Sequence, residues 1–320
     1  MTAAALRIGT RGSTLALAQA RAVAQLLGAA SEIVPITTAG DVDRGRDDKS
    51  RWVGALEAAL TAGDIDLAVH SAKDVPGELA PGTAIVAAPR RADPSDMLVG
   101  EPRLAHVREG ARVGTSALRR RAQLLAERPD LDVVELRGNV DTRLRKRAAG
   151  EVDVLVLAAA GLDRLGRRGE AGGALTGHVF VPAAGQGVIA VQAREGSAAA
   201  DVAVTVGHAR TLACLRAERA AVRELNASCH TSVGIHASGV TIRGFAGLPD
   251  GSEWLVDETA LGGGGERAEG AGGEGAEGGG DESAVGRGDD LEAAGLALAR
   301  RMLAAGAADL LREAEAMAAR

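Results

Sequence analysis

The first two thirds of this 320-residue chain alternate short apolar strands with amphipathic helices, and no other feature limits the fold as strongly. Leu6 and Ile8 indicate a short strand, a glycine-containing turn follows, and residues 14–28 place Leu15 and Leu26 on one helical face. Strands that alternate with helices form parallel βαβ units whose helices cover both faces of the sheet. The pattern predicts an α/β protein.

The alternation breaks at residues 91–99, RADPSDMLV, and then starts again. The second stretch predicts three strands and two helices, one capped by Thr115 or Ser116 and the other by Asn139. It ends near residues 179–193. Two such stretches predict two doubly wound lobes with a cleft between them.

The expected domain boundaries follow from these breaks. We assign residues 1–95 and 188–206 to the first domain, and residues 96–187, with an arginine-rich cleft face, to the second. The remaining residues, 207–320, are expected to form a smaller α+β domain. It has a long amphipathic helix over residues 211–229, strands at 233–247 and 253–259, and one or two helices at the C-terminus.

A glycine-rich run interrupts this third domain. Residues 262–288 hold 13 of the 44 glycines, mixed with Glu and Ala. Such a low-complexity segment has too few apolar side chains to build a core. We interpret it as a disordered insertion.

Composition and charge exclude several classes of function. The net charge is −6 and aromatic residues make up 1% of the chain, so neither a global basic footprint nor a stacking platform for nucleic acid is expected. Residues 101–150 nevertheless carry twelve Lys and Arg against seven Asp and Glu. A local basic cluster in an acidic protein favours a bound anion, and a solvated basic helix face is the equal alternative.

Other patterns concern the compartment and the redox state. Residues 172–193 carry no formal charge, but five glycines, Pro182 and two glutamines exclude a membrane span. The N-terminus reaches Arg7 before any long apolar run, so secretion is not expected and the protein is predicted to be cytoplasmic. Two cysteines are too few for a disulfide framework, and the histidines and cysteines show no zinc spacing, so no metal is expected.

Arginines recur where loops meet the predicted helices. They are Arg11, Arg119, Arg120, Arg137 and Arg143. Helix N-termini attract anions, and guanidinium groups there add bidentate recognition of carboxylate or phosphate. Arg143 and Arg147 are one helical turn apart and are expected to act together. Although any one arginine is more often a surface residue, the set favours a cleft that binds a polyanion.

The segment DLAVHSAKDVPG, residues 66–77, begins as a buried strand and then delivers Lys73 and Asp74 at its carboxyl end. Ligands of open α/β sheets bind outside these strand ends, whereas the alternative is a solvated strand end with an incidental ion pair. His70, Ser71 and Asp74 do not form a catalytic triad, because strand alternation points neighbours to different faces.

The two cysteines differ in context. Cys214 lies in the helical pattern LACLRAERA and is expected to be a small core residue. Cys229 lies where the long helix ends, among small and polar residues, which is consistent with partial exposure and reactivity. A lone cysteine normally has no function, so this one needs independent support.

That support comes from a series of segments read in order. Taken together they resemble the porphobilinogen deaminase family, also called hydroxymethylbilane synthases, over roughly residues 5–245. The most specific segments are HSAKDVP, SALRR and LRGNVDTRL, accompanied by LRIGTRGSTLALAQA, ADPSDMLV, AAAGLDRLG, PAAGQGVIAVQ and AERAAVRELNASC.

The resemblance implies a three-domain transferase of tetrapyrrole synthesis. Its first two domains are similar to the lobes of periplasmic binding proteins, with the active site between them. The third carries a cysteine, here Cys229, that holds a dipyrromethane cofactor by a thioether. Four porphobilinogen molecules are condensed head to tail on this primer, ammonia leaves at each step, and hydrolysis releases hydroxymethylbilane. Members of the family are usually monomers, and neither a nucleic-acid nor a membrane partner is expected.

The resemblance also assigns roles to residues. Asp74 matches the catalytic aspartate, which stabilises the azafulvenium cation left when ammonia departs. The cofactor contacts besides Cys229 are matched by Ser71, Lys73, Thr115, Ser116, Arg119, Arg120 and Gly138. The substrate contacts are matched by Arg11, Ser13, Arg137, Arg143 and Gln186.

One segment departs from the family pattern. The mobile loop of the family usually ends in Gly-Lys-Gly-Leu/Val-Phe, whereas this chain has GDVDRGRDDKSRWVG, with Lys49 at the lysine and Trp52 at the phenylalanine. A shorter lid can impair turnover or cofactor handling. The alternatives are therefore a catalytically silent paralogue that binds tetrapyrroles or small carboxylates, and a plain two-lobed carboxylate-binding module.

Overall fold

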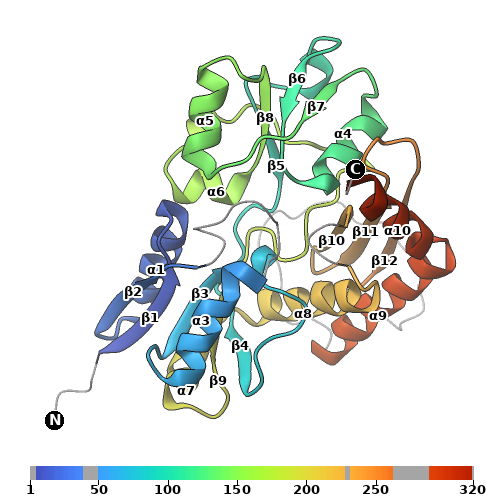
Figure 1. The fold of residues 1–320 in the computed structure, drawn as a ribbon. Coiled ribbons are helices and arrows are strands. Elements are labelled where there is room, and N and C mark those ends of the chain that lie inside the picture. Colours follow the sequence, from blue (N-terminus) through green and yellow to red (C-terminus); the bar gives the residue numbers. More distant parts are fainter. Residues whose placement is uncertain (1–4, 39–49, 228–230, 262–287, 319–320) are drawn as a thin grey trace, which may run out of the picture.

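The computed structural model describes residues 5–38, 50–227, 231–261 and 288–318, without the side chains of residues 50–52 and 288–289. Figure 1 shows two α/β lobes, one above the other, and a third part beside them that is built from an antiparallel sheet and helices. The predicted fold class is confirmed. The domain boundaries expected from the sequence stay a prediction.

The first lobe is a five-stranded sheet. Its order is β2 (Ser31–Ile36), β1 (Leu6–Arg11), β3 (Leu67–Ser71), β9 (Ile189–Arg194) and β4 (Thr83–Ala87). β1 runs parallel to β2 and β3, whereas β9 runs antiparallel to both β3 and β4. The all-parallel expectation fails at β9, because the chain enters this strand from the second lobe and not through a crossover helix.

Helices cover both faces of this sheet, as predicted. α1 (Thr14–Leu27) and α7 (Ala198–Val204) pack on the face of Ile8 and Val69. α3 (Ser50–Ala62) packs on the opposite face. Ser13 caps α1 by accepting a hydrogen bond from the Ala16 amide, and Gly63, with φ of 81°, ends α3 in a backbone conformation that favours glycine.

The second lobe has a four-stranded sheet with three α-helices. The strand order is β5 (Asp96–Val99), β8 (Val154–Ala158), β6 (Arg112–Gly114) and β7 (Asp132–Val134), and the helices are α4 (Leu118–Glu127), α5 (Val140–Ala148) and α6 (Ala159–Arg164). β5 is antiparallel to β8 because it enters from the first lobe.

The two predicted helix caps of this lobe have different outcomes. Asn139 caps α5, and its side chain accepts from the Thr142 amide at 2.9 Å. The cap of α4 was predicted at Thr115 or Ser116, which is wrong: Ala117 occupies that position and has no side-chain hydrogen bond there. Thr115 Oγ1 accepts instead from the amide of Ala117, the cap residue itself, so it does not cap the helix.

Within its described residues, the third part joins one antiparallel sheet to three helices. The elements are α8 (Ala209–Glu224), β10 (Val233–Ala237), β11 (Thr241–Gly247), β12 (Trp254–Ala260), α9 (Gly288–Ala304) and α10 (Ala307–Ala318). The stretch 233–247 is two strands, because the turn at Ser238 pairs β10 with β11. Two C-terminal helices are present. The glycine-rich run lies outside the described residues up to residue 287.

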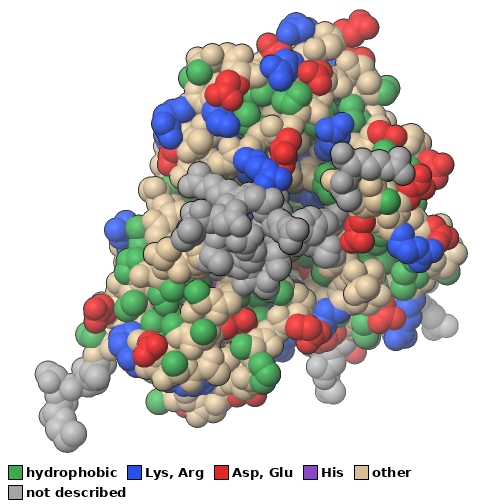
Figure 2. All heavy atoms as spheres, viewed as in Figure 1, with side chains coloured by type: hydrophobic (Ala, Val, Ile, Leu, Met, Phe, Trp, Pro, Cys, Tyr) green, Lys and Arg blue, Asp and Glu red, His purple; other side chains and the backbone are tan. Residues whose placement is uncertain are grey.

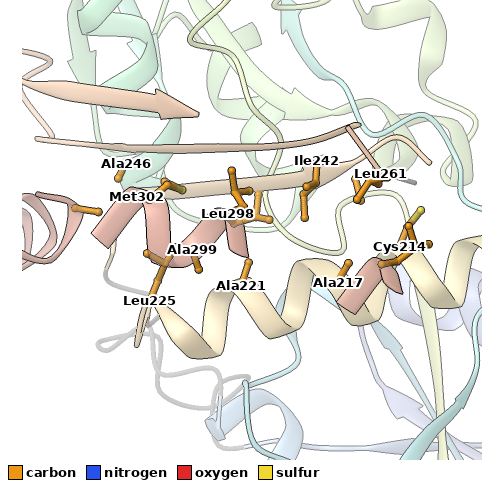
Figure 3. Packing of buried hydrophobic residues seen from close by; sticks show 14 of the residues in the cluster. Cys214, Ala217, Ala221, Leu225, Ile242, Ala246, Leu261, Leu298, Ala299 and Met302 are labelled. Carbon is orange, nitrogen blue, oxygen red and sulfur yellow. The ribbon is translucent and has the colours of Figure 1, made fainter. Parts of the chain in front are cut away.

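The core of this part is built from small aliphatic side chains and not from aromatic rings (Figure 3). Ala217 and Ala221 of α8 face Leu298 and Ala299 of α9. The helices approach so closely that a Cβ on Gly295 would lie 2.2 Å from the Ala217 carbonyl oxygen. Cys214 is 4% exposed in this cluster, which confirms it as a core residue.

Candidate active site

Two adjoining pockets lie at the carboxyl ends of the first-lobe strands. The strand-end pocket is lined by Arg11, Ser13, Leu15, Ala16, Gln19, Val53, Val69, His70, Ser71 and Asp74. The interlobe pocket is lined by residues of both lobes, and it shares Leu15, Gln19 and Ser71 with the first. A ligand in one pocket is therefore next to the other.

The interlobe pocket carries four basic side chains and no acidic one. Lys73 comes from the first lobe, whereas Arg120, Arg143 and Arg164 come from the second. Arg164 is held by a bond from Nη2 to the Gly187 carbonyl oxygen at 2.7 Å. Because a cleft lined by basic side chains attracts anions, the arrangement fits a ligand with several carboxylates.

A short turn carries both Lys73 and Asp74. β3 ends at Ser71, and a 3₁₀ turn over Ala72–Asp74 follows. This turn places Lys73 at the interlobe pocket and Asp74 at the strand-end pocket. The two side chains form no ion pair with each other in the described part of the chain, so the alternative of an incidental pair is wrong.

Lys73 is an unusual cation. Its Nζ donates to Gln186 Oε1 at 3.4 Å. Burial lowers the pKa of Lys73 to about 8, and the nearby charges of Arg120 and Arg119 act in the same direction, against Asp74 and Asp96. A bound carboxylate at this amine would favour its protonated form, so the position is suited to an anionic ligand.

Asp96 lies beside this cation and was not singled out as a site residue from the sequence. It is 5% exposed and accepts from Arg119 Nη1 at 2.7 Å and from Arg120 Nη2 at 2.7 Å. Gln186 Nε2 donates to the same carboxylate at 2.9 Å. Although burial opposes the charge, the two guanidinium groups hold the pKa of Asp96 well below its usual range.

Asp96, Arg119, Arg120 and Gln186 form what we call the Asp96 cluster. Its two arginines differ in whether they line a pocket. Arg119 also donates to Gln123 and to the Val181 carbonyl oxygen, and it lines neither pocket. Gln186 donates also to the Pro94 carbonyl oxygen at 2.6 Å. Only Arg120 belongs both to the cluster and to the pocket wall.

The remaining basic residues of the second lobe separate into two groups. Arg143 lines the interlobe pocket, and its Nη2 donates to Ser116 Oγ at 2.8 Å. Arg147 donates instead to the Asp153 carbonyl oxygen at 3.0 Å and lines neither pocket, so the expected partnership of the two is wrong. Arg137 pairs with Glu135 at 2.6 Å, also away from both pockets.

On the surface of this lobe, basic and acidic side chains are intermixed on the face shown in Figure 2. Arg108 pairs with Asp153, and Arg128 pairs with Asp130. The basic cluster of residues 101–150 is therefore neither one solvated face nor wholly an anion site.

Gln19 connects the two pockets, and Gly138 precedes α5. Gln19 of α1 exchanges hydrogen bonds with Ser71 Oγ at 2.9 and 3.1 Å and lines both pockets. It was missed in the sequence, although a polar residue on the apolar face of that helix was the available signal. Gly138 has φ of 128°, and a Cβ there would lie 2.8 Å from Thr142 Cγ2, which explains why glycine precedes the cap of α5.

Three expected residues cannot be placed. Cys229 and Lys49 lie outside the described residues, and Trp52 belongs to α3, but its side chain also lies outside them. Cys214 is buried, and burial raises the pKa of its thiol.

The fold and the pockets define a two-lobed α/β protein with a cleft lined by basic side chains and a carboxylate in the adjoining pocket. The family model described as porphobilinogen deaminase, dipyromethane cofactor binding domain, matches residues 6–201, and the model of the C-terminal domain of the same family matches residues 212–277. The chain belongs to the porphobilinogen deaminase family.

Individual relatives agree with the family models. The porphobilinogen deaminase of Syntrophotalea carbinolica is 45% identical over 81% of this chain and 87% of its own length. That of Rubrobacter xylanophilus is 43% identical over 96% of both chains.

Solved structures give a more distant comparison. A putative lipoprotein from Ruminococcus gnavus has a TM-score of 0.38 and 13% identity, covering 64% of this chain and 91% of its own. The periplasmic VFT2 domain of Bordetella pertussis BvgS has a TM-score of 0.37 and 17% identity, covering 63% and 86%. These scores are too low to extend the likeness to individual residues or ligands.

Proposed function

We propose that this chain is a porphobilinogen deaminase, a transferase that condenses four porphobilinogen molecules head to tail and releases ammonia and hydroxymethylbilane. One observation carries the proposal: a cleft with four basic side chains and no acid adjoins a pocket lined by Asp74. The substrate and the growing chain carry an acetate and a propionate on each ring. The cleft would neutralise these carboxylates while the aspartate acts on the pyrrole.

The residues of the interlobe pocket fit a dipyrromethane cofactor. Two linked pyrroles carry four carboxylates, and the pocket offers Lys73, Arg120, Arg143 and Arg164 with the hydroxyl of Ser71. Ser116 reaches the same wall through its bond to Arg143. When bound, the cofactor supplies the pyrrole at which the chain grows.

Cys229 is our choice for the attachment of this cofactor. The chain has only two cysteines, and Cys214 is 4% exposed with a raised thiol pKa, which disfavours the nucleophilic thiolate. Cys229 follows α8 closely in the sequence, and α8 packs against the connections between the lobes: Glu218 of α8 pairs with Arg91 at 2.5 Å.

Asp74 is proposed as the catalytic residue. Its carboxylate has no hydrogen bond or ion pair within the described residues, so its oxygens are left for a ligand. A fixed carboxylate accepts the pyrrole N–H and stabilises the cation that forms as ammonia leaves. Arg11 and Ser13, in the wall of the same pocket, would bind the carboxylates of the incoming ring.

The other expected residues receive revised roles. Arg119 and Gln186 are proposed to position Arg120 and Lys73 through the Asp96 cluster, and they need not touch a ligand. Thr115 and Gly138 shape the backbone before α4 and α5. We assign no ligand contact to Arg137.

The remaining proposals concern the domain boundaries, the lid segment, the oligomeric state and the cellular compartment. We propose three domains divided near residues 95, 187 and 206, a lid segment that includes Lys49 and Trp52, and a monomeric cytoplasmic enzyme. No helix in the described ranges combines the length and the apolar character needed to cross a membrane.

Intact-protein mass spectrometry with peptide mapping tests the proposal. Freshly purified protein should show a mass excess of two linked pyrroles on the peptide that contains Cys229, and Cys229→Ser should lack it. Protein that binds porphobilinogen but stays unmodified, and releases no ammonia, would favour the silent paralogue instead.

A further inference from the structure

A buried chain of polar groups crosses the first lobe from the strand-end pocket. His70 is 5% exposed and Gln192 is 0% exposed, and His70 Nε2 lies 3.1 Å from Gln192 Oε1. Gln192 Nε2 then donates to Glu57 Oε1 at 2.9 Å and to Thr83 Oγ1 at 2.8 Å. The chain thus connects β3, β9, β4 and α3.

The directions of these bonds determine the tautomer of His70. The Thr83 hydroxyl donates to the Ala80 carbonyl oxygen at 2.7 Å, so its oxygen accepts from Gln192. Both amide hydrogens of Gln192 are therefore used, and a reversed amide would place its oxygen against the Glu57 carboxylate. Gln192 Oε1 must accept, so His70 Nε2 carries the hydrogen and Nδ1 keeps its lone pair.

This lone pair is available to a ligand. Nδ1 has no hydrogen-bond partner among the described residues, and His70 lines the strand-end pocket together with Asp74. The charged groups near the ring are Glu57 on α3, Asp74 on the 3₁₀ turn and Arg11 on β1. Burial dominates over them and lowers the pKa of His70 to about 4, so the ring is neutral at physiological pH.

We propose that Nδ1 of His70 accepts a hydrogen bond from the aminomethyl ammonium group of the incoming porphobilinogen and is a further catalytic residue. This inference rests on the proposed function, because it names the group that holds the leaving amine. Asp74 and His70 then provide two acceptors in one pocket, one charged and one neutral.

The chemistry of the step explains why the acceptor is a weak base. The bond between the methylene carbon and nitrogen breaks, its electron pair stays on nitrogen, and neutral ammonia leaves a cation on the pyrrole. The amine must keep its three hydrogens until the bond breaks, since a neutral amine is a poorer leaving group. A neutral imidazole of low pKa holds an N–H without removing the proton.

Two substitutions separate this role from a structural one. In His70→Gln the longer amide can reach Gln192, so the buried chain is kept while the group at Nδ1 is lost. In His70→Asn the amide oxygen can replace Nδ1, but the bond to Gln192 is lost. We expect His70→Gln to be the more stable variant and the less active one, with kcat/KM for ammonia release lowered by about 10- to 100-fold.

The opposite pattern would overturn the inference. If activity simply follows stability, with His70→Gln close to the unchanged protein and His70→Asn impaired, then His70 is only part of the core. His178→Gln, at an exposed histidine outside both pockets, is the matched control and should change neither quantity.

Nitrogen-15 NMR of the imidazole gives a readout that does not depend on activity. The His70 signals should stay in the neutral Nε2–H form above about pH 5. A ring that titrates near the ordinary histidine pKa would refute the assignment even in an active enzyme. An unchanged protein that releases no ammonia, with this tautomer present, would instead refute the proposed function.

Discussion

The Asp96 cluster and the interlobe pocket contain neighbouring arginines in opposite situations. In the cluster, Arg119 and Arg120 are each 5% exposed and share one carboxylate. In the pocket wall, Arg143 and Arg164 face a cavity with no acidic side chain. Burying a charge is costly unless it is paired, so the cluster contains a carboxylate of its own, whereas no acidic side chain lines the pocket.

The difference indicates which arginines a ligand can reach. Arg120 lies at the boundary between the Asp96 cluster and the interlobe pocket, since it donates to Asp96 and also lines the pocket. The cluster thus connects a residue that can touch a ligand to residues that hold it in place. Substitutions on the two sides should affect stability and activity differently.

The largest effect is expected from Asp96→Asn. This change leaves two buried guanidinium groups without a counter-ion, and removal of one partner of a buried ion pair costs about 3–5 kcal/mol of unfolding free energy. Urea unfolding measures it. Asp132→Asn, in the exposed pair with Arg112, is the control and should cost under about 1 kcal/mol. Equal costs would contradict the view of the cluster as a buried frame.

The same variant has a pH signature. The pKa of Asp96 is lowered on folding, so its contribution to stability is present above the ordinary carboxylate pKa and is lost as the pH falls below it. The unchanged protein should therefore lose stability toward acid more steeply than Asp96→Asn.

Asp74→Asn should have the largest effect on catalysis. Loss of a preorganised charge at the reacting centre typically lowers kcat by about 10²–10³. The thermal midpoint should change little, because Asp74 has no partner within the described residues. Retained turnover would reject the role given to Asp74, and a large loss of stability would make it a structural residue.

Arg143→Lys and Arg147→Lys sharpen the comparison on one helix. Lysine lacks the fork that binds a carboxylate through two bonds, so Arg143→Lys should raise KM for porphobilinogen by about tenfold. Arg147 is held by the Asp153 carbonyl oxygen outside the pocket, and a lysine there should leave KM within about twofold. Similar values for both variants would show that charge alone, and not position, determines binding.

The smallest expected effect is a decrease in carboxylate affinity at alkaline pH. This alkaline limb of the binding profile is attributed to Lys73. Its pKa of about 8 means that the cation is lost as the pH rises through that value, so affinity for carboxylates should fall above about pH 8. Lys73→Arg should remove this limb, because a guanidinium stays charged. Titration of porphobilinogen binding from pH 7 to about pH 9.5 measures it, and an unchanged limb in the variant would assign it to another group.

Local features were predicted well from the sequence. The cap at Asn139 and the core position of Cys214 depend on short-range backbone chemistry and on helical periodicity, both of which are visible in a few consecutive residues. The same reasoning failed at α4, because Thr115, Ser116 and Ala117 are adjacent and the start of a helix can shift by one residue.

Features that depend on contacts between distant segments could not be predicted from the sequence. The antiparallel direction of β9 and β5 depends on the chain passing twice between the lobes. Asp96 lies 23 and 24 residues before its two arginines, and no spacing rule connects them. The hydrogen bond between His70 and Gln192 joins two residues that are 122 positions apart in the sequence.

The sequence by itself determined the α/β class, the strand end that carries Lys73 and Asp74, and the family through its motifs, because each is written in consecutive residues. Only the tertiary structure decided which arginine meets an acid and which meets an open pocket. Arg119, Arg137 and Arg143 look alike in a sequence, but burial and partners from distant segments separate them, since the energy of a charge depends on its surroundings and not on its neighbours along the chain.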